Sequence, residues 1–209
     1  MNNKKIKVAS LFSGIGGFEV GLKNSKLNAD VVFASEIDEN ARKSYISNWG
    51  NNNFEGDITK VNEHDVPAHD LLLAGFPCQS FSIAGKQRGF EDIRGTLFFD
   101  VARILNAKKP QYILLENVKN LISHDKTTTI RKILHTLNEI GYTVDFTIIN
   151  SCEAGVPQNR DRTYIFGILG FPAEPFNEDL RNTKSNSLKK DLNNTNFKGF
   201  NFFNNILWS

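Results

Sequence analysis

Residues 7–17 read Lys-Val-Ala-Ser-Leu-Phe-Ser-Gly-Ile-Gly-Gly, and the class of fold follows mainly from this run. A short apolar segment passes directly into a glycine-rich turn, and residues 18–22 are expected to begin a helix. The glycines would then lie at the carboxyl end of a strand, where a nucleotide-like ligand can approach the backbone. A tight strand-to-helix turn without any ligand is the open alternative.

The alternation of strand and helix continues to about residue 170. Short, mostly apolar runs predict buried strands, and longer amphipathic runs predict helices. The strands are expected at 7–12, 30–35, 70–74, 112–116, 142–150 and 163–169, and the helices at 39–49, 97–106 and 127–140. This order is typical of an α/β fold built on a parallel sheet.

Composition is that of an ordinary folded protein. Of the 209 residues, 40% are hydrophobic and 23% are charged, which excludes a wholly disordered or coiled-coil chain. The net charge of +2 does not by itself indicate a nucleic-acid partner. No run approaches the ~20 apolar residues that span a bilayer, and the N-terminus lacks a cleavage-site pattern, so we expect no membrane contact and a cytoplasmic location.

Composition changes after Gly170, where a polar, asparagine-rich segment leads to an apolar and aromatic end. We expect one domain over residues 1–170, followed by a linker and apolar tail over residues 171–209. The two cysteines are too few to staple such a domain and are not paired in zinc-binding motifs, so no metal site is expected.

Two acidic residues follow expected strands on the ligand edge. Glu36 comes about twenty residues after the glycines, where a carboxylate accepts hydrogen bonds from ribose hydroxyls, and Asp57 could end a third strand. The dinucleotide fingerprint is broken at Glu19, and the phosphate-binding loop motif is absent. These features favour an adenosine-containing ligand without a diphosphate, with S-adenosylmethionine as the first candidate. For Glu36 or Asp57 alone, simple capping of a turn is an equal alternative.

A cysteine lies just past the fourth expected strand, in the run Gly75-Phe76-Pro77-Cys78-Gln79-Ser80. A nucleophilic thiol needs a neighbouring cation to lower its pKa, and Arg160 or Arg162 could supply that charge. Packing in the core is the usual alternative for a lone cysteine, and we expect it for Cys152.

Glu116 ends the fifth expected strand, so a carboxyl group and the thiol would lie on adjacent strand ends as acid and nucleophile. The polar stretch 82–96 carries basic residues suited to phosphates, and Arg160 and Arg162 could grip a phosphate or a base edge. A solvated loop and surface salt bridges are the corresponding alternatives.

Taken in order, these motifs resemble those of the DNA (cytosine-5)-methyltransferase family of bacterial restriction-modification systems. The matching elements are Phe12 to Gly17, Glu36, Gly56-Asp57, Pro77-Cys78-Gln79, Glu116-Asn117-Val118 and Gln158 to Arg162. The resemblance implies the Rossmann-like fold of S-adenosylmethionine-dependent methyltransferases, a mostly parallel twisted sheet with helices on both faces. It also implies methyl transfer from S-adenosylmethionine to carbon 5 of cytosine in duplex DNA.

The resemblance carries roles onto particular positions. Catalytic roles fall on Cys78 as nucleophile, Glu116 as the acid at ring nitrogen 3, and Arg160 as support for the extruded base. The donor-binding positions are Phe12, Gly14, Gly16, Gly17, Glu36, Ile37, Asp57, Ile58, Pro77 and Leu97. The DNA-binding positions are Gln79, Ser82, Lys86, Arg88, Val118, Gln158 and Arg162.

Complete bacterial members continue into a target-recognition region and a closing helix, and neither is visible after Gly170. We therefore expect that recognition requires a second subunit, with a restriction endonuclease as functional partner. A truncated or interrupted reading frame is another explanation. Competing functions are a catalytically silent DNA- or partner-binding remnant and a cytosine-5 methyltransferase acting on transfer RNA. A nicotinamide or flavin oxidoreductase and a cysteine hydrolase are disfavoured.

Overall fold

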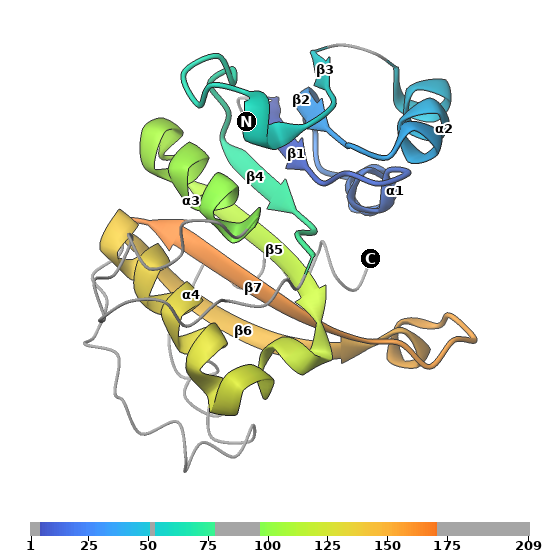
Figure 1. Cartoon of the computed structure of the whole chain (residues 1–209). Helices are drawn as coiled ribbons and strands as arrows, with labels where there is room; N and C mark the ends of the chain where they lie inside the picture. The colour runs from blue at the N-terminus through green and yellow to red at the C-terminus, as the bar shows by residue number, and fades with distance from the viewer. Residues whose placement is uncertain (1–4, 51–52, 78–96, 171–209) are drawn as a thin grey trace.

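The computed structural model describes residues 5–50, 53–77 and 97–170, and it shows a single seven-stranded sheet flanked by helices (Figure 1). The strands are β1 (Ile6–Leu11), β2 (Ala29–Ser35), β3 (Phe54–Glu55), β4 (Leu71–Ala74), β5 (Tyr112–Val118), β6 (Tyr142–Asn150) and β7 (Asp161–Leu169). The helices are α1 (Gly17–Asn24), α2 (Glu39–Trp49), α3 (Leu97–Lys108) and α4 (Thr128–Ile140), and the short 3₁₀ turns are η1 (Ile58–Lys60), η3 (Lys119–Leu121), η4 (His124–Thr127) and η5 (Ser151–Ala154).

The strand order is β3-β2-β1-β4-β5-β7-β6, and the strands from β3 to β5 are parallel. β7 is antiparallel to both of its neighbours, β5 and β6. The chain between β6 and β7 contains only the turn η5, and a parallel pair would need a longer crossover connection. The expected mostly parallel α/β sheet is confirmed, with β7 as its one reversed strand among the described residues.

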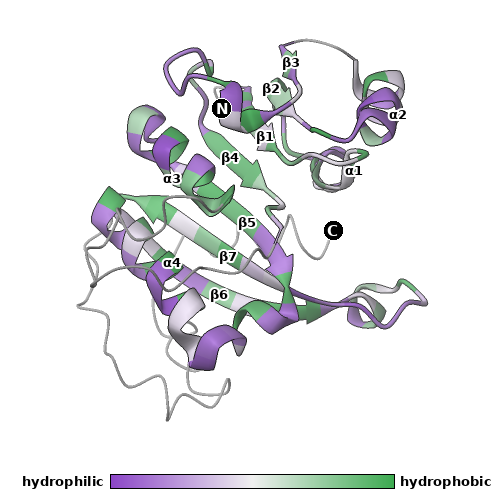
Figure 2. Cartoon of the chain, in the orientation of Figure 1, coloured by the Kyte–Doolittle hydropathy of each residue, from purple (hydrophilic) through white to green (hydrophobic). Residues whose placement is uncertain are grey.

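The two faces of the sheet bury separate groups of side chains. One face packs against α3 and α4, and the other packs against α1, because successive residues of a strand point to opposite faces. Ala9 and Leu11 of β1 therefore join the first core, while Val8 joins the second. In Figure 2 the strands of the sheet centre are mainly hydrophobic, whereas α2 is largely hydrophilic and buries only Tyr45.

Helix α4 shows how the sequence determines one of these elements. Its buried residues recur at helical spacing on the side that faces the sheet: Thr129, Ile130, Ile133, Leu134, Thr136, Leu137 and Ile140. Gly141 ends the helix in the left-handed conformation, with φ of 112°, where a glycine carries no steric penalty. The expected helix at 127–140 is thus confirmed to within one residue.

Element boundaries differ at places that matter for the site. β5 continues to Val118, so Glu116 lies inside the strand rather than at its end. β7 begins at Asp161, which brings Arg162 into the sheet. Within the described residues, no helix is both long and apolar enough to cross a membrane. The proposed boundary at residue 170 stays a prediction.

Candidate active site

The glycine turn is held by the backbone of the neighbouring strand. The amide of Ser13 donates to the carbonyl of Ser35 over 3.0 Å, and the amide of Gly16 donates back to Ser13 over 3.0 Å. Gly14 and Gly16 have φ of 56° and 99°, in the left-handed region that favours glycine. A Cβ on Gly16 would also lie 2.0 Å from Nε1 of Trp49, so this position has no room for a side chain.

Glu36 joins this turn to the end of β2. Its Oε2 accepts a hydrogen bond from the amide of Gly14 over 2.9 Å, and its Oε1 accepts one from the amide of Asp38 over 2.8 Å. The carboxylate therefore caps the local backbone, and each oxygen keeps a further lone pair for a ligand. Ile37, the next residue, is 70% exposed and offers an apolar surface at the same edge.

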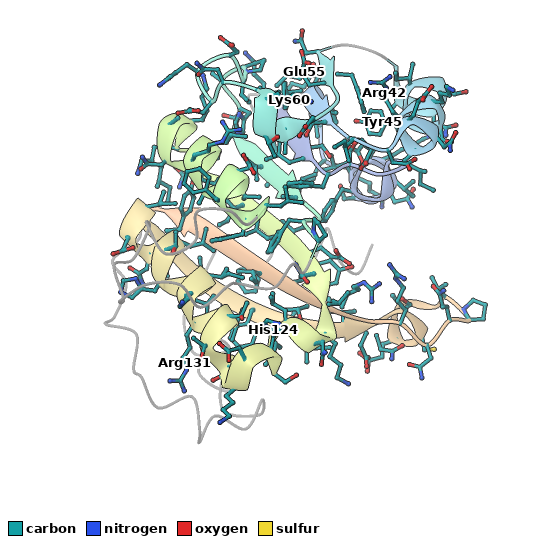
Figure 3. The ribbon with its side chains drawn as sticks, in the orientation of Figure 1. Arg42, Tyr45, Glu55, Lys60, His124 and Arg131 are labelled. Carbon is teal, nitrogen blue, oxygen red and sulfur yellow. The ribbon has the colours of Figure 1, made fainter. Side chains whose placement is uncertain are left out.

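Below the glycine turn, α1 and α2 meet through a buried carboxyl group. Glu19 is 2% exposed, and its Oε1 accepts a hydrogen bond from the hydroxyl of Tyr45 over 2.9 Å. Burial raises the pKa of Glu19, and the neighbouring hydrogen-bond donors, Ser10 and Tyr45 among them, oppose this only in part. The ring of Tyr45, which is labelled in Figure 3, also packs on Phe54 of β3, with 4.9 Å between ring centroids. Glu19 thus faces the protein interior rather than the turn.

Asp57 follows β3 and caps η1. Its Oδ1 accepts hydrogen bonds from the amide and the hydroxyl of Thr59, over 3.1 and 2.7 Å, and its Oδ2 pairs with Lys60 over 3.3 Å. The hydrogen bond from Thr59 is the main reason that the pKa of Asp57 lies below its usual value. Lys60 projects from η1 at the surface (Figure 3). The third strand is only two residues long and ends before Asp57 rather than at it.

The segment that leads to Cys78 is anchored by Asn117. The side-chain amide of Asn117 donates to the carbonyl of Phe76 over 2.7 Å, and its Oδ1 accepts from the amide of Val118. Asn117 is 2% exposed, so this bond is shielded from water. A Cβ on Gly75 would lie 3.6 Å from Oε2 of Glu116, and the carboxyl group therefore lies beside the start of this segment.

Glu116 forms an ion pair with Arg162 across the antiparallel strands. The distance from Nε of Arg162 to Oε1 of Glu116 is 2.8 Å, and both side chains are mostly buried. Desolvation raises the pKa of Glu116 above its usual 4.5, although the charges of Arg162 and Arg160 pull it down. A carboxyl group in this environment can hold a proton closer to neutral pH than a surface glutamate can.

The start of β7 separates the two arginines. Arg162 points at Glu116, whereas Arg160 is exposed in the connection before the strand, together with Gln158.

The packing role expected for Cys152 is wrong. Its side chain is exposed in η5 and donates a hydrogen bond from Sγ to the carbonyl of Gln158 over 3.1 Å, because β6 and β7 extend past the rest of the sheet here (Figure 1).

Several predicted positions gather at one edge of the sheet. The carboxyl ends of β1, β2, β4 and β5 carry or directly precede Phe12, Gly14, Gly16, Gly17, Glu36, Ile37, Pro77, Glu116 and Val118. Leu97 begins α3, and Asp57 and Ile58 follow β3. Cys78, Gln79, Ser82, Lys86 and Arg88 lie outside the described residues. The sequence predicts no role for Asn117, although an asparagine next to Glu116 in an otherwise apolar run is a signal.

Comparison with known proteins identifies the family of this sequence. The sequence model of the C-5 cytosine-specific DNA methylase family matches residues 6–201. The chain is 51% identical over 177 residues to the Type II methyltransferase M.NgoBI of Neisseria gonorrhoeae, covering 82% of this chain and 55% of the relative. It is 48% identical over 160 residues to the Type II methyltransferase M.HhaI of Haemophilus parahaemolyticus, covering 77% of this chain and 48% of the relative.

A solved structure gives the same result for the fold. The Dnmt2 methyltransferase of S. pombe superposes with a TM-score of 0.64 at 28% identity, covering 82% of this chain and 52% of that one. The chain thus spans about half the length of the relatives that it matches. Because the family model covers nearly the whole chain and the fold agrees, the chain belongs to the C-5 cytosine-specific DNA methylase family.

Proposed function

We propose that this chain carries the catalytic half of an enzyme that transfers a methyl group from S-adenosylmethionine to carbon 5 of cytosine in duplex DNA. The observation that supports this best is the desolvated Glu116 carboxyl, paired with Arg162 and lying beside Gly75, three residues before Cys78. Glu116 would then serve as an acid close to the nucleophile Cys78. The choice of reaction, methyl transfer to cytosine, follows from the names of the family and of the relatives.

The residues around the glycine turn fit a methyl donor of this kind. A Cβ on Gly14 or Gly17 would meet nothing within 4 Å, so the backbone is open to a close ligand. Glu36 keeps lone pairs for ribose hydroxyls, and the exposed Ile37 offers an apolar contact for a base. The donor supplies a methyl group on a sulfonium, and the remaining donor contacts would come from Phe12, Gly16, Asp57, Ile58, Pro77 and Leu97.

Chemistry at the base requires a nucleophile and an acid together. The thiolate of Cys78 adds to carbon 6 while Glu116 gives a proton to ring nitrogen 3, and carbon 5 becomes an enamine carbon that can attack the methyl group. After transfer leaves S-adenosylhomocysteine, a base removes the proton from carbon 5, the proton on ring nitrogen 3 returns to Glu116, and the thiolate leaves, which restores the aromatic ring, the acid and the free cysteine. Arg162 holds the Glu116 carboxyl in place, and Arg160 supports the base after it leaves the duplex.

DNA contacts beyond the reacting base fall on Gln79, Ser82, Lys86, Arg88, Val118 and Gln158. Reading a target sequence requires side chains in the major groove. We propose that a second subunit, or further polypeptide such as the relatives possess, provides this reading. The protein would act with a restriction endonuclease and protect host DNA from it, in line with the Type II methyltransferase names of the relatives.

The test is covalent trapping. Duplex DNA with 5-fluorocytosine at many positions and labelled S-adenosylmethionine is incubated with the chain, alone and with extract fractions of its host. Fluorine at carbon 5 blocks the last elimination, so a working enzyme stays bonded to the DNA. We expect an adduct that resists denaturing gels, that disappears in Cys78→Ser and that persists in Cys152→Ser, the matched control with an exposed thiol.

Each outcome has a separate meaning. An adduct only in the presence of extract supports a partner that supplies recognition. An adduct that survives Cys78→Ser contradicts the nucleophile. Donor binding without an adduct under any condition favours the silent remnant, and an adduct with transfer RNA alone would contradict DNA as the substrate.

A further inference from the structure

We propose that Arg103 is a positioning residue for the methyl donor, because it fixes the Asp57–Ile58 turn against α3. The donor would then be held between two elements whose separation this arginine sets. The inference rests on the proposed function, since Asp57, Ile58 and Leu97 contact the donor only if the donor binds at this edge.

Arg103 uses all three of its nitrogens to join α3 to the chain after β3. Nε donates to Oδ1 of Asp100 over 3.0 Å, and Nη1 donates to Oε2 of Glu63 over 2.9 Å. Nη2 donates to the carbonyl of Ile58 over 2.7 Å. The side chain is 13% exposed, and that of Asp100 is 10% exposed, so these bonds are largely shielded from water.

The carbonyl of Ile58 is the point where this network touches the donor-binding turn. It also accepts the hydrogen bond from the amide of Val61 that closes η1. Asp57, the residue before Ile58, caps the same turn by accepting a hydrogen bond from the amide of Thr59. The side chain of Ile58 is 3% exposed and belongs to the core under α3. The turn η1 is therefore already closed by its own hydrogen bonds. What Arg103 adds is a fixed position of η1 relative to α3.

The same helix carries a second predicted donor contact. Leu97 is the first residue of α3, six residues before Arg103, which corresponds to ~9 Å along a helix axis. Between them, Phe98, Val101 and Ala102 are buried in the core, so α3 is fixed on the sheet. Leu97 and Ile58 are thus linked through α3 and the guanidinium group of Arg103. A shift of the turn relative to α3 would change the distance between these two donor contacts.

An arginine suits this task better than a lysine. Its planar group presents several N–H donors in fixed directions, whereas a lysine ammonium is a single point charge. Asp100, one helical turn earlier, orients the guanidinium, and Glu63 offsets its charge from the other side. The fixed orientation of the Arg103 guanidinium therefore determines the direction in which the carbonyl of Ile58 is held. A lysine in a salt bridge would not fix this direction.

The chain offers a matched control in Lys108. Its Nζ donates to the carbonyl of His64 over 2.8 Å, so it joins the same helix to the same stretch of chain, six residues beyond Ile58. If any link between α3 and this stretch of chain were enough to hold the donor site, the Lys108 variant would also weaken donor binding. A positioning role would affect donor binding only in the Arg103 variants.

The experiment measures S-adenosylmethionine binding to the full chain by calorimetry, together with the melting temperature, for Arg103→Met, Arg103→Lys and Lys108→Met. We expect Arg103→Met to weaken donor binding about tenfold, as loss of a charged hydrogen bond does. Arg103→Lys should recover part of this, and Lys108→Met should bind within about twofold of the unchanged protein. Unchanged donor affinity in Arg103→Met, or an equal loss in Lys108→Met, overturns the proposal.

Two further measurements keep the result clear. If Arg103→Met does not fold, Glu63→Ala removes one outer partner of the guanidinium and should weaken donor binding less strongly but in the same direction, and unchanged binding counts against the proposal. Glu36→Gln tests the donor site itself. If the unchanged chain binds no donor, or if Glu36→Gln binds as well as it does, the donor site of the proposed function is wrong, and the role of Arg103 falls with it. If Glu36→Gln loses affinity and Arg103→Met does not, only the role of Arg103 is wrong.

Discussion

Arg162 and Glu116 lie diagonally across the antiparallel pair of β5 and β7, and Nε of Arg162 is 2.8 Å from Oε1 of Glu116. Glu116 is directly opposite Tyr164, and Arg162 is directly opposite Val118, so all four side chains share one face of the sheet. The ion pair therefore depends on the register of two strands that are far apart in the sequence. The pair joins Glu116, the expected acid, to Arg162 in β7, the last strand of the described chain.

The first prediction concerns the protonation of Glu116. In Arg162→Gln the pKa of Glu116 should rise further, because burial already raises it and the largest opposing charge is lost. The measurement is a pH titration of the glutamate side-chain carbons by NMR, with the signal assigned through Glu116→Gln. Arg160→Gln is the control and should raise this pKa less, since its charge contributes less. A lower pKa in Arg162→Gln would contradict the assigned electrostatics.

The second prediction concerns the glycine turn. Gly16→Ala should destabilise the fold by about 1–3 kcal/mol, because alanine is strained at a positive φ and its Cβ would overlap the ring of Trp49. Gly17→Ala is the matched control, since it begins α1, has no positive φ and meets nothing within 4 Å. Urea unfolding of both variants is the measurement. Equal stability of the two would contradict both the backbone strain at Gly16 and the overlap with Trp49.

The third prediction concerns the anchor of the segment before Cys78. Asn117→Ala leaves the buried carbonyl of Phe76 without its partner and should cost about 1–3 kcal/mol of folding free energy. Adduct formation with fluorinated DNA should fall more than donor binding, since Phe76 precedes Cys78 by two residues. Asn120→Ala, at an exposed position, is the comparison. Asn117→Ala with unchanged adduct formation would mean that the anchor does not position the cysteine.

The fourth prediction concerns pH and stability. Burial raises the pKa of Asp145 above its ordinary 3.8, so its contribution is most favourable below that pH and is lost as pH rises through the folded value. The stability of Asp145→Asn relative to the unchanged chain should therefore improve as pH rises from 4 to 8. Urea unfolding across that range provides the measurement.

Asp161 gives the opposite trend and serves as the control. Hydrogen bonds from Lys119 and Asn150 lower its pKa, so its contribution is present above 3.8 and is lost as pH falls through the folded value. Asp161→Asn should accordingly become less stable, relative to the unchanged chain, as pH rises from about 2 to about 5, so its urea unfolding is measured down to that lower limit. The same trend in both variants would argue against the burial of Asp145.

The sequence predicted those parts of the fold that depend on local patterns. The strand, turn and helix around Gly14, and helix α4 before Gly141, follow from apolar spacing and from residues that permit one backbone conformation. The short β3 could not be read, because two paired residues carry no periodicity. The reversal of β7 was equally invisible, since it depends on how the chain returns to β5.

Contacts that join distant parts of the chain were the main omissions at the site. The bond from Asn117 to Phe76 spans 41 residues, and neither residue shows in isolation that it has this partner. The sequence placed Arg160 and Arg162 together, yet β7 begins at Asp161, so only Arg162 lies in the strand and pairs with Glu116. Cys152 was misjudged because its exposure is decided by how far β6 and β7 project, not by its neighbours in sequence.

The reversed β7 makes the charge of the site sensitive to strand mispairing during folding. Asp161 and Thr163 flank Arg162 and point to the other face of the sheet. A slip of one residue between β5 and β7 would turn Arg162 away and could bring Asp161 beside Glu116, placing two carboxylates together without a cation. Such a misfolded form would be penalised by repulsion between those carboxylates, so the alternating charges at the start of β7 help to select the native register.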